Sequence, residues 1–572
     1  MTFPILGANG AGAEQYLIDN SLRFNRGDSP YLSRTPSNSG NQKTFTTSFW
    51  LKHSNVTQDQ AIMVCGTTTA FNISIVDSGT RFFIANTQFG VTQNFSVTPN
   101  ALSRDSSAWL HVVVAIDTTQ STNADRVKIY FNGELQSHAG TNYPSQNFNA
   151  ITNPTTEWRI GYSTGGGSGY LDGYLSEFHH IDGQALSPTD FGEFDEDSGI
   201  WKPIEYEGTY GTNGFYLDFE NSGSLGADQS GNGNNFTPTN LASTDQTTDT
   251  PTNNFATLIL RGDNASTGTL IEGNLAWSGQ NTNAIYQGTQ GFSSGKWYWE
   301  IKNGSGSGYP SIGVITQNHY GELSTTNFAW RVWLQTGNIY NGVTQNGSLG
   351  AFGDTDILNI AVDSDNGKIY FGKNGSWWNS GNPATSTNPS FSNLPTDEHI
   401  MPALQQYRSG SFNFGNPPAT FTISSGNSDQ NGYGNFEYAP PSGYLALCTQ
   451  NLATELSPTI DDGSEYFHTQ LYTGTGSAFN EVNDANAGDF KPDLVWVKDR
   501  ITPYNHILVD STRGANNNLE ITTGAEATFS SITSFNTDGF GVGTGVGVNT
   551  NTDNYVAWQW KANAGSTSSN TD

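Results

Sequence analysis

The chain has 572 residues, of which 23 are Lys or Arg and 52 are Asp or Glu, so its formal net charge is −29. Basic residues this sparse exclude the clustered Lys and Arg on which nucleic-acid affinity depends. No apolar run reaches the ~18 residues that a membrane-spanning helix needs, so we expect no membrane insertion. Aromatic residues make up 12% of the chain, with 65 Gly and 22 Pro, which favours short strands joined by turns. We predict an all-β protein.

The first predicted domain covers residues 1–245 and contains a series of strand-like segments. The run from Trp109 to Ile116 is apolar at successive positions, which predicts a central strand covered on both faces. The overlapping sequence AIDTTQSTNADRVKIYFNG ends at Gly133 and predicts a β-hairpin, and the similar AVDSDNGKIYFGKNG ends at Gly375. Because a hairpin alone is only marginally stable, each copy should belong to a larger sheet. We therefore expect tandem β-sandwiches.

Several motifs of the first domain resemble one family. The WLHVVV strand, the KIYFNGE hairpin and the segment IGYSTGGGSGYLDGYLSEFHHIDGQALSPTDF together resemble the laminin-G-like, concanavalin A-like jelly roll. The resemblance implies a sandwich of two sheets. The family contains lectins, adhesion modules and glycosidases, so it leaves the function open. His179 and His180 should point to opposite faces of their strand, which indicates structural histidines rather than joint metal ligands.

An acidic cluster in the first domain is the candidate for catalysis. Glu193, Asp195 and Asp197 alternate in GEFDEDSG, which resembles the E-x-D-x-E strand of related glucanases. Retaining glycosidases need two carboxyls ~5 Å apart, and side chains two positions apart on a strand can supply that spacing. However, the third position is Asp rather than Glu, and the preceding SPTDFG favours a turn or short helix. We predict a solvated acidic loop and no catalytic residue, with a glycan hydrolase kept as an alternative function.

Oxygen-bearing side chains alternate in ADQSGNGNNF, where Asp228, Ser230, Asn232 and Asn234 occupy every second position. Calcium takes several oxygen ligands, so Asp228, Asn232 and Asn234 are candidate metal ligands. The family resemblance also brings in calcium, because laminin-G-like domains often carry it. The sequence offers no distal carboxylate to complete the set. The alternative is an Asx-rich turn held by its own side-chain-to-backbone hydrogen bonds and without any cofactor.

The second predicted domain covers residues 253–435. In GKWYWEIKNG, Trp297 and Trp299 alternate with Tyr298 and Glu300, which predicts a strand with one face in a core. This motif is followed in order by SIGVI, DILNIAVDSDNGKIYFGKNGSWWNSGNPAT and IMPALQQYRSGSFNFG, and together they resemble a SPRY domain, which is also a concanavalin A-like sandwich. The resemblance implies a binding module without chemistry of its own, which recognises partners through loops at one end.

Two adjacent tryptophans in the second domain, Trp377 and Trp378, are candidate ligand-binding residues. Neighbouring residues on a strand face opposite ways, so one ring is expected to pack inward and the other to be exposed. An exposed Trp can stack on a sugar ring or anchor a protein interface. The alternative is plain packing of both rings.

A third β domain is predicted over residues 440–563, after a boundary at residues 426–444 and before a flexible polar tail over residues 564–572. Its strand NYVAWQWKA places Trp558 and Trp560 on one face. The segments KPDLVWVKDR, DSTRGANNNL, TSFNTDGFGVG and YVAWQWKA together resemble a module of large structural proteins of tailed bacteriophages, especially marine ones. This resemblance implies a virion component.

These resemblances lead to an expected function. We expect a bacteriophage virion protein, namely a tail fibre or another receptor-binding adhesin, made in the host cytoplasm and released in the virion by lysis. Its expected partners are other virion proteins and a glycan or protein of the host surface. Several weak sites gain avidity in a symmetric assembly, so a homo-oligomer is expected, with a trimer as the usual arrangement. The first alternative is a capsid- or tail-decorating protein that contacts only other virion proteins.

Overall fold

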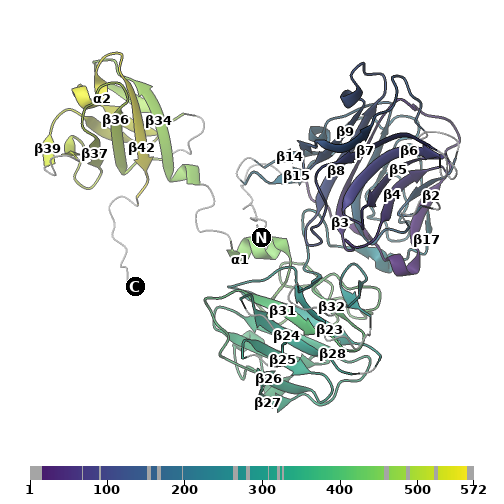
Figure 1. Ribbon diagram of the computed structural model, residues 1–572. Coiled ribbons are helices and arrows are strands. Elements are labelled where there is room, and N and C mark those ends of the chain that lie inside the picture. The colour runs from purple at the N-terminus through teal and green to yellow at the C-terminus, as the bar shows by residue number, and fades with distance from the viewer. Residues whose placement is uncertain are drawn as a thin grey trace. The chain divides into compact units, whose positions relative to one another are not determined.

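A computed structural model describes residues 16–66, 69–88, 92–150, 156–163, 169–195, 198–261, 268–278, 284–306, 308–318, 322–324, 327–456, 463–484, 490–520 and 526–562. The chain divides into two compact units, one that ends at residue 457 and one that begins at residue 458. Regular structure in both units is almost entirely β strand, which confirms the predicted all-β class (Figure 1).

The first sandwich is built from two sheets, each of eight strands within the described residues. The order of the first sheet is β10-β9-β8-β3-β13-β1-β18, with β16 paired to β13. Its strands are β1 (Ser21–Phe24), β3 (Thr44–His53), β8 (Leu110–Asp117), β9 (Val127–Phe131), β10 (Glu134–Leu135), β13 (Gly173–Asp182), β16 (Phe215–Leu217) and β18 (Gln246–Thr247).

The second sheet of this sandwich has the order β11-β7-β6-β5-β4-β12-β2-β17. Its strands are β2 (Tyr31–Arg34), β4 (Gln60–Cys65), β5 (Thr69–Val76), β6 (Arg81–Gln88), β7 (Thr92–Pro99), β11 (His138–Asn142), β12 (Trp158–Ile160) and β17 (Thr237–Thr239). A separate hairpin joins β14 (Gly192–Phe194) and β15 (Trp201–Pro203). The apolar sides of the two large sheets meet in one core, which includes Phe49, Phe71, Val112 and Leu175.

The burial of two neighbouring strands follows their sequence patterns. β8 lies between β3 and β9, and six of its eight residues are buried, as predicted for a strand covered on both faces. In β9, Val127, Ile129 and Phe131 are buried while the residues between them are half-exposed. His180 lies against core rings such as Phe215, and His179 stacks on Tyr216 instead.

The second sandwich also has two sheets, with the orders β19-β22-β31-β24-β25-β26-β27 and β20-β21-β32-β23-β28-β29-β30. A short strand, β33, pairs in parallel with β23. The strands of the first of these sheets are β19 (Leu258–Leu260), β22 (Ile285–Gly288), β24 (Ser311–Thr316), β25 (Ala329–Trp333), β26 (Asn338–Asn341), β27 (Thr344–Ser348) and β31 (Ile400–Gln405). Those of the other are β20 (Leu270–Ile271), β21 (Ala276–Trp277), β23 (Lys296–Asn303), β28 (Ile357–Asp363), β29 (Lys368–Lys373), β30 (Ser376–Trp377), β32 (Gly410–Asn413) and β33 (Leu445–Ala446).

Strand β23 differs from its sequence prediction because both of its faces are covered. Trp297 and Trp299 enter the main core as expected, but Tyr298 and Glu300 on the other face are also buried. The segment that we predicted as a boundary, residues 426–444, packs over this second face, and its Phe436 ring lies 5.1 Å from that of Tyr298. The compact unit therefore extends beyond this segment, to residue 457.

The two hairpins predicted from the repeated sequence occupy the same place in their sandwiches. The order β10-β9-β8-β3 in one sheet corresponds to β30-β29-β28-β23 in the other. Asn132 and Gly133 turn the chain after β9, and Asn374 and Gly375 turn it after β29, all four with positive φ. This is the Asn-Gly geometry of a tight type I′ turn. The side chain of Asn132 accepts a 2.8 Å hydrogen bond from the backbone N–H of His111, near the start of β8. The side chain of Asn374 accepts one of the same length from the backbone N–H of Ile357, at the start of β28.

The two sandwiches share a buried polar joint within their compact unit. The ammonium group of Lys52, on β3, lies 2.7 Å from Asp249 Oδ2 and also donates to Asn254 Oδ1 and to the carbonyl oxygen of Phe255. Asp249 in turn accepts a hydrogen bond from Trp109 Nε1. The polar segment near residue 250 is therefore fixed from the first sandwich, while Phe255 packs in a cluster of the second.

Arg23, on β1, makes a second connection between the sandwiches and is fully buried. Its guanidinium group donates to the carbonyl oxygens of Thr244 (2.8 Å) and Pro417 (3.2 Å), and its Nε lies 3.8 Å from Glu272 Oε2. Glu272 also accepts a hydrogen bond from Asn25. Buried charged groups that are paired and hydrogen-bonded on several sides fix the relative placement of the two sandwiches.

The C-terminal unit contains a six-stranded sheet with the order β34-β42-β36-β37-β38-β39 and a three-stranded sheet with the order β35-β41-β40 in its described part. The strands are β34 (Phe467–Thr473), β35 (Phe479–Val482), β36 (Leu494–Asp499), β37 (Ile507–Asp510), β38 (Asn517–Glu520), β39 (Glu526–Thr528), β40 (Ile532–Asn536), β41 (Gly539–Val542) and β42 (Asn554–Trp560).

Helices are few and short throughout the described residues. The α-helices are α1 (Thr449–Leu456) and α2 (Val546–Asn549). The 3-10 turns are η1 (Arg26–Asp28), η2 (Asn123–Asp125), η3 (Pro188–Asp190), η4 (Ser243–Asp245), η5 (Trp378–Ser380), η6 (Pro383–Thr385) and η7 (Gly463–Glu465). In the described parts of the chain, none of these helices has the length and apolar character needed to cross a membrane.

Candidate functional site

Trp377 and Trp378 pack against different parts of the second sandwich. Trp377 ends β30, and its ring centroid lies 6.4 Å from those of Tyr298 and Tyr370. Trp378 opens η5 and lies over Gly347, where an added Cβ would come within 2.3 Å of the indole. The two side chains thus diverge as expected of neighbours, but each is half-buried and neither ring is fully exposed. Ligand binding by this pair stays a prediction.

The side chains of the predicted calcium loop make hydrogen bonds to the backbone. Asp228 Oδ1 accepts from the N–H groups of Tyr216 and Ser230, and Asp228 Oδ2 accepts from that of Asn234. Asn232 and Asn234 both donate their amide groups to the carbonyl oxygen of Gly214. The Oδ1 atom of Asn234 accepts from Arg34. These bonds form the Asx-rich turn that was the alternative interpretation, and calcium binding by Asp228, Asn232 and Asn234 stays a prediction.

The acidic cluster lies on the β14–β15 hairpin, outside the large sheets, and follows the short helix η3. Lys202 on β15 pairs with Glu193 at 3.4 Å and with Asp195 at 3.1 Å. Hydrogen bonds from Ser198 and Lys202 hold the pKa of Asp195 below its usual value, whereas a general acid needs a raised pKa. Asp197 lies outside the described residues. The described carboxylates are therefore arranged as surface ion pairs.

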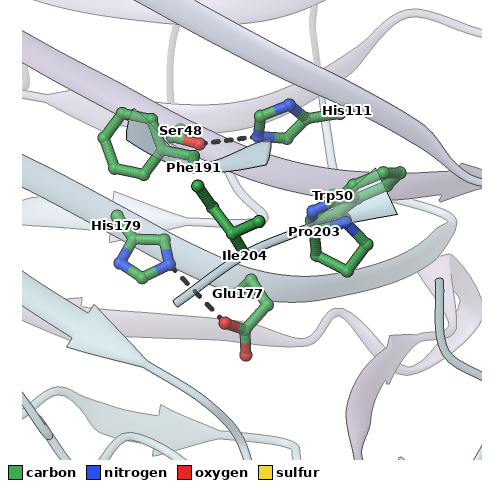
Figure 2. A pocket seen from close by; sticks show the side chains of 8 residues that line it. All are labelled: Ser48, Trp50, His111, Glu177, His179, Phe191, Pro203 and Ile204. Atoms are coloured by element: carbon green, nitrogen blue, oxygen red, sulfur yellow. Dashed lines mark hydrogen bonds and ion pairs between the residues drawn. The ribbon is translucent and has the colours of Figure 1, made fainter. Parts of the chain in front are cut away.

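A polar cluster that the sequence did not indicate lies in the first sandwich and includes Pro203 of β15 (Figure 2). It is lined by Ser48, Trp50, His111, Glu177, His179, Phe191, Pro203 and Ile204. The space between these side chains is too narrow to hold a water molecule. The cluster is therefore a packed region of the first sandwich and has no room for a substrate.

The Ser48–His111 pair in this cluster resembles the nucleophile and base of a hydrolase. Ser48 Oγ lies 2.9 Å from His111 Nε2. The dashed line between these two side chains in Figure 2 marks this hydrogen bond. On the other side of the ring, Trp201 Nε1 donates a 2.9 Å hydrogen bond to His111 Nδ1. An indole N–H is a donor only, so the imidazole proton resides on Nε2 and is donated toward the serine. Burial also lowers the pKa of His111 to about 3. This tautomer cannot take a proton from Ser48.

Glu177 in the same cluster is bound by tyrosines. It lies at a bulge between β13 and β3 and has a positive φ of 48°. The hydroxyls of Tyr16 and Tyr216 each donate to its carboxylate at 2.8 Å, and His179 Nε2 lies 3.7 Å away. Burial and the Glu177 carboxylate raise the pKa of both tyrosines, which keeps them protonated as donors. This arrangement attaches Tyr16 to the sheet and explains the conformation of Glu177 structurally.

One face of the six-stranded sheet in the C-terminal unit carries several aromatic residues that are exposed or half-buried. Along β34 buried and exposed side chains alternate, and Phe467 and Leu471 are 42% and 57% exposed. On the neighbouring β42, Trp558 and Trp560 are half-buried, with one side open to solvent, while Tyr555 and Ala557 enter the core. The sequence predicted that these tryptophans share a face. The structure adds that this face is the outer one.

Cross-strand pairing joins these rings into one surface, which we call the aromatic face: Phe467, Trp496, Trp558 and Trp560. Phe467 is opposite Trp560, and Trp496 on β36 is opposite Trp558. The ring centroids of these two pairs lie 5.1 and 5.2 Å apart. Across the same face of β34, β42 and β36, all of it described, Lys498 is the one charged residue. The face therefore presents a continuous, nearly uncharged surface that is suited to apolar and stacking contacts.

Comparison with protein families divides the chain into three segments. Residues 26–190 match the laminin G model of the concanavalin A-like lectin/glucanases superfamily, and residues 296–417 match the SPRY domain. Residues 462–572 match a domain of unknown function, DUF7483. The chain thus contains a laminin-G-like concanavalin A domain and a SPRY domain, and both predicted resemblances are confirmed at this level.

Individual relatives are distant. Nuclear factor 7, brain, of Xenopus laevis is 32% identical over 89 residues, which is 15% of this chain and 14% of that protein's length. The solved SPRY domain of human HERC1 is 19% identical, covers 27% of this chain and 91% of its own, and has a TM-score of 0.19. A heptameric SAP-like pentraxin from Limulus polyphemus is 16% identical over 30% of this chain and 78% of its own, with a TM-score of 0.23. Similarity at this level carries no function to the chain.

Proposed function

We propose that this chain is a non-catalytic recognition protein that binds surface glycans and acts as an attachment protein of a virus particle. The observation that carries the proposal is the aromatic face of the C-terminal unit. Partly exposed indole rings stack on the apolar faces of sugar rings, and a face with one charged residue requires little desolvation of charge when a neutral glycan covers it. The face is built on paired strands, so its rings are held in place before a ligand arrives.

Binding is favoured over catalysis by the state of the polar side chains. The His111 imidazole carries its proton on Nε2, so it cannot act as the base that would activate Ser48. The pKa of the Asp195 carboxyl is lowered, whereas a general acid needs a raised pKa. A glycan hydrolase acting through the first domain would need a carboxyl held protonated near neutral pH. Its test is the replacement of Glu193 by Gln together with Asp195 by Asn, which would abolish polysaccharide cleavage if that alternative were correct.

Assignment to a virion rests on the resemblance of the C-terminal segments to a structural module of tailed bacteriophages. In a particle, the chain would act as a tail fibre or another receptor-binding protein, and assembly into a homo-oligomer, such as a trimer, would multiply weak glycan contacts into avidity. The alternative role is decoration of the capsid or tail. The aromatic face also supports this alternative, because exposed apolar patches commonly seat another protein.

The test combines a glycan array with location in the particle. The intact chain should bind a subset of glycans on the array, and Trp558→Ala should weaken that binding at least about tenfold, which corresponds to ~1.4 kcal/mol. Trp333→Ala, at a half-buried Trp of the second sandwich, is the matched control and should leave binding unchanged. Retained binding by Trp558→Ala would remove the aromatic face as the site.

Immunogold labelling of purified particles separates the two virion roles. Label at the tail tip together with glycan binding supports attachment. Label on the head or tail shaft, with no glycan bound by the intact chain, supports decoration and overturns the proposed function. Absence of label from particles overturns both virion roles.

A further inference from the structure

A groove lies where the two sandwiches of the first compact unit meet. Its volume is about 390 Å³, within the range of ligand pockets in proteins. One wall comes from the first sandwich and includes Thr244, Gln246 and Thr248. The other wall comes from the segment after β32 and includes Asn416 and Thr422. Domain interfaces are a preferred place for ligand sites because each side contributes its own groups.

The walls of the groove are held at a fixed separation by buried bonds. Arg23 donates to the carbonyl oxygen of Thr244 in one wall and to that of Pro417 in the other. Glu272 accepts a hydrogen bond from the N–H of Ala419, also in the second wall. Asn416 is 1% exposed and donates to Asp249, the partner of Lys52. The groove is thus preorganised, so binding there does not incur the cost of ordering its walls.

None of the 15 residues that line the groove is charged, in a chain with a formal net charge of −29. The hydroxyl groups of Thr244, Thr248 and Thr422 make no hydrogen bond with any described residue, and each of these residues is exposed. The lining also includes two prolines, an alanine, an isoleucine and the buried Phe421. Hydroxyl groups both donate and accept hydrogen bonds, which matches the hydroxyls of a sugar, while the apolar patches match its C–H faces.

The buried side of the groove holds a polar atom without a partner. Asn416 Oδ1 is enclosed and has no hydrogen-bond partner among the described residues. An unpaired buried carbonyl is destabilising, because it has lost its hydrogen bonds to water without gaining others. Because this oxygen is enclosed, a ligand hydroxyl can pair with it only when the Asn416 side chain turns toward the groove.

We propose that this groove is a second glycan site, which takes a neutral saccharide of about two sugar units. The proposal rests on the proposed function for the source of the ligand and adds a site separate from the aromatic face. Acidic glycans are excluded because the groove offers no cation to neutralise them. The uncharged lining and the number of free hydroxyls favour sugar over a peptide, whose binding would require pairing of its backbone N–H and carbonyl groups along an exposed strand edge.

The test uses the intact chain and neutral disaccharides of glucose, galactose, mannose and N-acetylglucosamine, followed by saturation-transfer NMR and calorimetry. Thr248→Trp and Thr422→Trp each fill the groove from one wall, and both positions are exposed, so the fold should tolerate them. Thr122→Trp, at another exposed threonine that does not line the groove, is the matched control. We expect at least one disaccharide to bind, and binding to weaken about tenfold or more in both groove variants and not in the control.

The remaining outcomes separate this proposal from the proposed function. Binding that survives in both groove variants but is lost in Trp558→Ala overturns the groove site and leaves glycan recognition standing. Binding of sialylated or sulfated sugars, or of neutral peptides, in place of the disaccharides overturns the ligand class. If no disaccharide binds while the glycan array is positive, the groove site is wrong. If the array is also negative, the proposed function fails with it.

Discussion

Lys52 and Asp249 form an ion pair of 2.7 Å that is buried on both sides, with side chains 1% and 0% exposed. Removal of one partner from such a pair leaves an uncompensated charge in the interior, which costs about 3–5 kcal/mol. We therefore expect Lys52→Met to lower the free energy of unfolding of the first compact unit by that amount in urea denaturation. Lys128→Met, which removes an ion pair with both side chains more than a third exposed, should cost less than about 1 kcal/mol. Equal losses in the two variants would contradict the role of Lys52.

The raised pKa of Glu300 should make the free energy of unfolding depend on pH. It is fully buried, and burial raises its pKa to about 7 from 4.5. The folded state therefore keeps a proton that the unfolded state releases between pH 4.5 and 7. The stability that this group contributes is complete below pH 4.5 and decreases as pH rises to 7, by about 3 kcal/mol.

The measurement for Glu300 is denaturation of the intact chain and of Glu300→Gln from pH 4.5 to 8. As pH rises, the free energy of unfolding of the intact chain should fall relative to that of Glu300→Gln, because Gln cannot ionise. Carbon-13 NMR of the Glu300 carboxyl should show a midpoint near 7. A midpoint near 4.5 would contradict this prediction and show that the four hydrogen-bond donors to the carboxylate, Tyr298, Asn413 and the N–H groups of Glu437 and Tyr438, fully offset the effect of burial.

A side chain at Gly133, in the turn after β9, should lower the stability of the first sandwich. It has a φ of +82°, and an added Cβ would lie 2.4 Å from the Trp201 ring. Gly133→Ala therefore combines a left-handed backbone, at about 1–2 kcal/mol, with overpacking at about 1–3 kcal/mol. Gly231→Ala, where φ is +84° and no atom lies within 4 Å, should carry the backbone cost alone. Thermal unfolding of both variants measures the difference, and similar midpoints would contradict the contact with Trp201.

Because His111 donates its Nε2 proton toward Ser48, we expect the Ser48 hydroxyl not to react as a nucleophile. Nitrogen-15 NMR should show the Nε2-protonated tautomer at neutral pH and no titration above pH ~4, because burial lowers the pKa of this imidazole to about 3. A fluorophosphonate probe should leave Ser48 unlabelled by mass spectrometry. Labelling of Ser48, or an Nδ1-protonated ring, would reopen a hydrolase function. Trp201→Phe removes the N–H donor that fixes the tautomer and should permit the other form.

The sequence predicted those parts of the fold that depend on local pattern. The repeated KIYF segments and the Asn-Gly turns that follow them identified both hairpins, since φ > 0 at two successive positions requires these residue types. The alternation in NYVAWQWKA placed Trp558 and Trp560 together. It could not indicate which face they occupy, because hydrophobicity alone would have put indoles in the core, whereas Tyr555 and Ala557 are the residues found there.

Features formed by distant residues could not be predicted. Lys52 and Asp249 are separated by 197 positions, and the segment around Asp249 has the Thr-rich composition of an exposed boundary. Its burial results from the second sandwich packing against it. For the same reason the groove has no motif: its two walls lie more than 150 residues apart along the chain. Asp228 and the asparagines after it formed an alternating pattern suited to calcium, but the pattern does not reveal that backbone N–H and carbonyl groups occupy those side chains.

Arg23 has a consequence for how information could pass through the molecule. Its single guanidinium group spans Thr244 and Pro417, so any hinge motion between the sandwiches must break a buried, charge-assisted bond. A ligand at either sandwich therefore has no low-energy rotation through which to report its presence to the other. Arg23 therefore fixes the two sandwiches to each other and does not relay motion between them.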